Sequence, residues 1–108
     1  MNKGNGMKKA VVLLHEIYGV NNHIQQYKSK FIALGYDVYC PNFIQLEQPF
    51  PYEEEQEAYA YFMNDIGFEK SFVQVQNLLL ECKDTYKEIH IVGFSIGATI
   101  AWICSELT

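Results

Sequence analysis

The pentapeptide Gly-Phe-Ser-Ile-Gly at 93–97 fits the pattern G-x-S-x-G, whose central serine can act as a nucleophile. A β-branched run at 89–92 precedes it and an apolar segment at 98–107 follows it, as a strand and a helix around a nucleophile elbow would. Such a turn brings chain segments so close together that glycines are needed beside it. We therefore predict that Ser95 stands at the carboxyl edge of a sheet and that the Ile96 N–H stabilises an oxyanion. A chance match of the pentapeptide is the alternative.

A second segment at 15–19, His-Glu-Ile-Tyr-Gly, follows the short apolar run at 10–14. In an open parallel sheet the loops at the carboxyl ends of the strands lie at one edge, so this loop should open beside Ser95. There the Ile17 N–H can supply the second oxyanion donor. An ordinary strand-to-helix loop, in which His15 caps the strand and the following glutamate is solvated, is the alternative.

The elements that must position these residues follow from periodicity and capping signals. The apolar run at 10–14 predicts a strand that is buried on both faces, and 36–40 predicts a second strand. Between them we expect a helix with Asn22 as its N-cap and Gly35 as its C′ residue. Strand, helix and strand within about thirty residues predict a βαβ unit with parallel strands.

The rest of the chain continues the alternation. The segment at 42–52 predicts a loop, 53–66 a helix with glutamates near its start, and 68–86 an amphipathic helix. The strand at 89–92 and an apolar last helix then enclose the elbow. The predicted fold class is three-layer α/β, a parallel sheet with helices on both faces.

Length and composition bound the function. The 108 residues, 49% of them hydrophobic, suffice for one domain and are too apolar for a disordered chain. A net charge of −5, with lysines but no arginine, excludes nucleic-acid recognition. The three cysteines, Cys40, Cys82 and Cys104, have no metal-ligand spacing, and the N-terminus is neither a signal peptide nor a membrane span. We therefore expect a reduced, cytoplasmic protein without membrane contact.

From Val11 to Asn42 the chain resembles the dienelactone hydrolase family of the α/β-hydrolases. The shared motifs are Glu-Ile-Tyr-Gly at 16–19, Gly-Tyr at 35–36, Pro-Asn at 41–42 and the elbow at 93–98. With these motifs at the family's spacing, the resemblance covers about the whole chain after its first eight residues.

The resemblance implies roles for particular residues. Ser95 is the nucleophile, the amides of Ile17 and Ile96 form the oxyanion hole, and Glu16 lies beside the nucleophile. Two departures from the family pattern matter. Dienelactone hydrolases proper have a cysteine at the elbow where this chain has Ser95, and they have a glutamine at the position of His15. The serine shifts the expectation towards the esterase-like relatives.

A serine nucleophile also needs a base, and in α/β-hydrolases an acidic residue and a histidine follow the serine in the chain. Residues 96–108 contain no histidine. We expect His90 to be a structural or edge histidine and His23 to be a surface residue or cap neighbour. His15 with Glu16 is a conceivable makeshift base, although neighbours in sequence tend to point apart. The chain thus lacks the downstream Asp and His, and we expect it to be inactive or weakly active alone.

The resemblance implies that the first strand lies between the other two, as the three central strands of a truncated sheet. Residues 1–108 then form a single partial domain, the N-terminal half, with 1–8 as a flexible lead-in. The uncovered edge of the third strand and the last helix favour either a fragment or a homodimer through that surface.

The reaction that the resemblance implies is hydrolysis of a small-molecule carboxylic ester or lactone through an acyl-enzyme, without a metal or an organic cofactor. Two alternatives remain open. The chain is a non-catalytic truncated hydrolase that serves as an interaction module, or it performs acyl transfer or peptide hydrolysis on the same fold.

Overall fold

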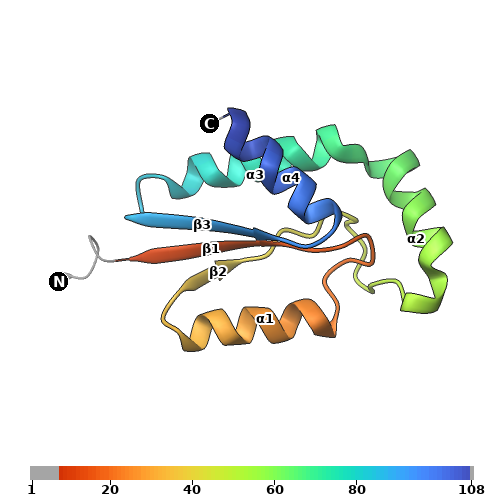
Figure 1. The fold of residues 1–108 in the computed structure, drawn as a ribbon, viewed down its shortest axis with the longest axis horizontal. Helices are drawn as coiled ribbons and strands as arrows, with labels where there is room; N and C mark the ends of the chain where they lie inside the picture. Colours follow the sequence, from red (N-terminus) through yellow and green to blue (C-terminus); the bar gives the residue numbers. More distant parts are fainter. Residues whose placement is uncertain (1–7, 108) are drawn as a thin grey trace.

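Three parallel strands form one sheet in the order β2-β1-β3 (Figure 1). Strand β1 (Lys9–Leu14) lies between β2 (Asp37–Tyr39) and β3 (Glu88–Gly93). The computed structural model describes residues 8–107, so the expected lead-in at 1–8 lies outside the described residues except for its last member. The predicted fold class and the central place of the first strand are confirmed.

The continuous apolar run of β1 is buried because helices cover both faces of the sheet. Helix α1 (Asn22–Ala33) lies on one face, and α3 (Gly67–Cys82) and α4 (Ile96–Leu107) lie on the other (Figure 1). Alternate residues of β1 therefore serve two separate cores. Val12 and Leu14 belong to the cluster under α3 and α4, whereas Val11 and Leu13 join Ile24 of α1.

The caps of α1 are where the sequence prediction needs a correction. The N-cap is Asn21, not Asn22: its Oδ1 accepts the Ile24 N–H at 3.2 Å, and its backbone is extended at φ −101° and ψ −172°. Asn22 is already the first helical residue, and an N-cap must have non-helical dihedrals to fold its side chain over the first turn. The predicted C′ residue is confirmed, because Gly35 has φ +98° and donates to Ile32 O, as in a Schellman motif.

The segment predicted as one helix over 53–66 is divided into three. It comprises a 3-10 turn η2 (Tyr52–Glu54), the helix α2 (Glu55–Tyr61) and a π-helical turn η3 (Phe62–Ile66). The break before α3 comes at Gly67, whose φ of +81° favours glycine.

Helix α3 ends at Cys82 instead of reaching Tyr86 as predicted. The reason is a tertiary contact: Tyr86 donates to Asp37 Oδ2 at 2.8 Å, and its hydroxyl lies 2.6 Å from that of Tyr39. The residues after Cys82 therefore turn to reach β2 rather than continue the helix. Within the described part of the chain, every helix is too short or too polar to span a bilayer.

Candidate active site

The turn between β3 and α4 is extremely short. Strand β3 ends at Gly93 and α4 begins at Ile96, so only Phe94 and Ser95 connect them. Ser95 is exposed and has φ +56°, a left-handed conformation that is uncommon for a residue with a side chain. The turn is closed by the N–H of Gly97, which donates to Phe94 O at 2.8 Å. The strand-turn-helix context expected from the sequence is therefore present.

The two glycines of this turn sit at close backbone approaches. A Cβ on Gly93 would lie 2.3 Å from the carbonyl oxygen of Gly97. A Cβ on Gly97 would lie 2.4 Å from the carbonyl oxygen of Leu14 at the end of β1. Both distances are impossible for a real Cβ, so each position requires glycine, as the steric argument from the sequence predicted.

The loop that follows β1 lies directly beside this turn. The N–H of Phe94 donates to the carbonyl oxygen of Leu14 at 3.1 Å, which ties the elbow to the start of the 15–19 loop. The side chains of Ile17 and Ile96 are each 8% exposed and belong to the same core cluster. The structure thus brings together the two segments that carry the expected oxyanion amides.

His15 is fully buried, and backbone groups occupy both of its ring nitrogens. Its Nε2 accepts the Phe43 N–H at 2.9 Å, so its Nδ1 carries the proton and donates to the carbonyl oxygen of Glu16. Burial lowers the pKa of His15, and the hydrogen bond to Glu16 offsets only part of that effect. In this arrangement a neutral His15 holds the loop at Phe43, and no ring nitrogen is free to serve as a base.

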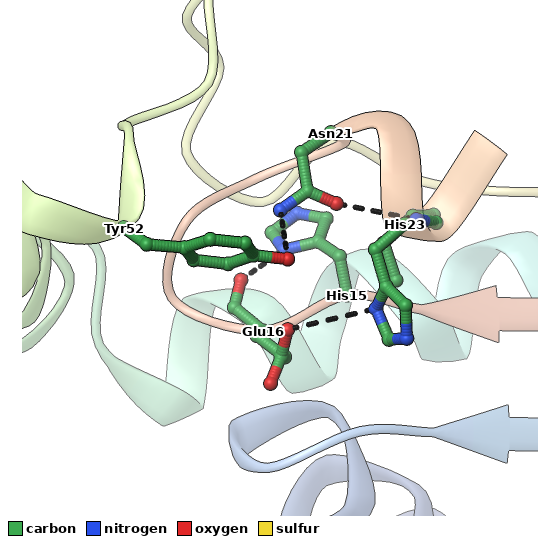
Figure 2. Close-up of polar contacts among 6 residues, drawn as sticks. His15, Glu16, Asn21, His23 and Tyr52 are labelled. Atoms are coloured by element: carbon green, nitrogen blue, oxygen red, sulfur yellow. Dashed lines mark hydrogen bonds and ion pairs between the residues drawn. The ribbon is translucent and has the colours of Figure 1, made fainter. Parts of the chain in front are cut away.

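Glu16 and His23 form a pair at the elbow that sequence reasoning did not find. His23 Nδ1 lies 3.9 Å from Glu16 Oε1, and the His23 ring contacts the Phe94 ring at 5.4 Å between centroids. Figure 2 shows the carboxylate and the imidazole side by side, facing the turn between β3 and α4. His23 Nδ1 is shielded from solvent and has no hydrogen-bond partner among the described residues. The sequence held one indication of this position: His23 lies in the first turn of a helix that begins at this edge of the sheet.

His90 lies well away from this edge, as expected. It pairs with Val11 in the sheet, whereas Gly93, where the elbow starts, pairs with Leu14. Its Nε2 lies 3.3 Å from Glu88 Oε1 on the surface. The position therefore fits a structural or surface histidine.

A cleft of about 710 Å³ opens next to the Glu16–His23 pair. It lies between the start of α1 and the segment at 48–52, and His23 lines it. Tyr52 closes one side: its hydroxyl accepts a hydrogen bond from Asn21 Nδ2 at 3.3 Å (Figure 2). The Tyr52 ring meets the ring of Tyr18 edge-on. The volume is in the range of ordinary ligand sites.

Among the side chains that the structure describes, His, Cys, Asp and Glu residues do not gather into a group of three that could hold a metal ion. Burial raises the pKa of the Cys40 thiol to about 11, with Lys28 opposing part of the shift, so that thiol is protonated at neutral pH.

Comparison with known proteins is consistent with this architecture. A family model described as the dienelactone hydrolase family matches residues 1–108. The chain is 36% identical over 100 residues to YczH, an uncharacterized protein of Bacillus subtilis (strain 168). That match covers 93% of this chain and 48% of YczH, so the chain spans about half the length of the curated relative that it matches. The chain belongs to the dienelactone hydrolase family.

Proposed function

We propose that Ser95 is the nucleophile of a serine hydrolase that cleaves carboxylic esters or lactones through an acyl-enzyme. One observation carries the proposal: Ser95 is exposed at φ +56° in a two-residue turn between a strand and a helix. A non-glycine residue in this conformation costs free energy that a purely structural turn would avoid with glycine. The strain is explained if the serine hydroxyl itself is needed at this point.

In the proposed reaction Ser95 Oγ bonds to the carbonyl carbon of the ester while its proton passes to a general base. The carbonyl oxygen becomes an oxyanion that accepts hydrogen bonds from the Ile17 and Ile96 amides. The bond to the alcohol then breaks, and the base returns the proton to the leaving oxygen. Water attacks the acyl-enzyme by the same route, releases the acid and restores the serine.

The base and its acidic partner are proposed to lie outside this chain. Backbone groups occupy both nitrogens of His15, and His90 sits further back along β3. His23 lies at the elbow with its Nδ1 towards Glu16, and the described residues include no hydrogen bond from His23 to Ser95. The chain would then contribute the nucleophile and the oxyanion donors, and the missing partners would belong to the half of a longer relative that it does not match.

Two further predictions remain alongside this proposal. The free Cys40 and Cys82 agree with a cytoplasmic location. The edge of β3 and the surface of α4, where Trp102 is 64% exposed, remain the proposed contact between two copies of the chain.

The test is acylation of Ser95 itself. The chain is treated with an alkyl fluorophosphonate, which loses fluoride as it phosphonylates a serine oxygen, and the label is located by mass spectrometry of peptides. Because the oxyanion donors are present and the base is not, we expect slow labelling of Ser95 in the folded chain and loss of the label in urea and in Ser95→Ala, while Ser29→Ala on the exposed face of α1 keeps it. Release of p-nitrophenol from p-nitrophenyl acetate is measured in parallel. Equal rates for the unaltered chain and Ser95→Ala, with no label on Ser95, would favour a non-catalytic module.

A further inference from the structure

We infer that the cleft beside the elbow binds an uncharged, hydrogen-bonding part of the substrate and disfavours a carboxylate there. The inference deepens the proposed function, because it rests on that function for the presence of a reacting ester next to the cleft. It assigns the chemical class of the group that the cleft holds.

The cleft is joined to the elbow through one side chain. His23 lines the cleft and also contacts both Phe94, the residue before Ser95, and Glu16. A substrate whose carbonyl lies at Ser95 would therefore extend past His23 into the cleft.

The polar lining consists mainly of carboxamides. Five of them border the cleft: Asn21, Asn22, Gln25, Gln26 and Gln48. Each carboxamide can donate and accept at once, and the Tyr52 hydroxyl adds a further donor and acceptor. Such a lining matches a group that does both as well, namely an amide or a hydroxyl. The remaining walls are apolar, with Val20, Phe50 and two prolines able to pack against a carbon chain.

The charges around the cleft are unfavourable for an anion. Among the described residues no lysine lines it, and Glu16 lies beside His23, which does. On the outer side, Tyr52 is followed by glutamates at 53–55 and 57, all exposed. The pKa of the nearby Tyr18 is raised first by desolvation and then by the negative charges of Glu55 and Glu16. A carboxylate in the cleft would meet these glutamates and the neutral dipoles of the carboxamides, and only the N-terminus of α1 and a protonated His23 would act in its favour.

The test uses two small ligands that differ in one group. Glutaramide ends in two carboxamides, and glutaramate has the same three methylene groups with one carboxylate. Each is titrated into the ¹⁵N-labelled chain, and the side-chain NH₂ signals of the five carboxamides are followed by NMR. We expect saturable shifts with glutaramide and binding at least about tenfold weaker with glutaramate.

A pair of variants separates the local field of the cleft from the net charge of the protein. Gln25→Lys adds a cation to the cleft, whereas Asn77→Lys adds the same charge at an exposed position of α3 outside it. Glutaramate and glutaramide should bind Gln25→Lys with similar affinity. Asn77→Lys should keep the preference of the unaltered chain for glutaramide.

Two results would overturn the inference. One is equal or tighter binding of glutaramate to the unaltered chain, and the other is the absence of shifts at the cleft with either ligand. Binding is independent of turnover, so Ser95→Ala should give the same ligand preference. If Ser95 fails to acylate while the preference holds, the proposed function fails and the assignment of the cleft stands.

Discussion

Gly97 lies against the carbonyl oxygen of Leu14 so closely that an added Cβ would come within 2.4 Å of that oxygen. This contact places the first turn of α4 directly on the end of β1. It explains how a serine on one segment and an oxyanion loop on another come to share one edge of the sheet. The neighbouring hydrogen bond from Phe94 N–H to Leu14 O holds the two segments in the same register.

Gly97→Ala should therefore lower the free energy of unfolding. The backbone of Leu14 cannot move without disturbing the buried β1, so we expect a loss of about 1–3 kcal/mol, as for overpacking in a core. Urea denaturation followed by circular dichroism measures it. Thr99→Ala, at an exposed position of the same helix, is the control and should change stability by less than about 0.5 kcal/mol. A fully stable Gly97→Ala would mean that α4 can lift away from β1.

Ser95→Gly should be more stable than Ser95→Ala. Both lack the hydroxyl, but only glycine adopts φ +56° without the clash between Cβ and the backbone. We expect a difference of about 1 kcal/mol in the free energy of unfolding, measured by the same urea titration. Both variants should fail to react with the fluorophosphonate. Equal stability of the two would show that the turn relaxes when the serine is removed.

Asn21→Ala should destabilise the chain by about 1 kcal/mol, because the N-cap bond to the Ile24 N–H is lost. Asn22→Ala is the matched control, since Asn22 is the next residue and already lies in the helix. Thermal unfolding of the two variants side by side gives the comparison. The reverse ranking would restore Asn22 as the cap that the sequence suggested.

His15 should make the chain less stable in mild acid. Burial lowers its pKa in the folded state below the ordinary value of 6.5, so the unfolded chain binds more protons between the two values. The contribution is complete above about pH 6.5 and is lost as the pH falls towards the folded-state pKa. We expect His15→Gln to show a smaller loss of stability between about pH 7.5 and about pH 5.5 than the unaltered chain.

The comparison for His15 requires urea titrations at both pH values. His90→Gln serves as the control, because His90 is exposed and contacts the surface residue Glu88. Its stability should follow that of the unaltered chain across the range. A pH dependence that His15→Gln leaves unchanged would show that the pKa of His15 does not differ between the folded and the unfolded chain.

The sequence by itself determined the features that depend on local chemistry. The continuous apolar run of β1 predicts burial on both faces, Gly35 allows the left-handed end of α1, and Gly93 permits the tight turn at Ser95. Each of these features involves residues close together in the chain, so pattern and residue type suffice to predict it.

Only the tertiary structure decided which distant groups meet. The bond between His15 and Phe43, the early end of α3 before Tyr86, and the cleft between α1 and the 48–52 segment all join parts of the chain far apart in sequence. The choice of Asn21 over its neighbour as N-cap depends on the backbone direction in which the loop leaves β1. Residue type cannot reveal these contacts, because they depend on how the packed layers bring separate segments together.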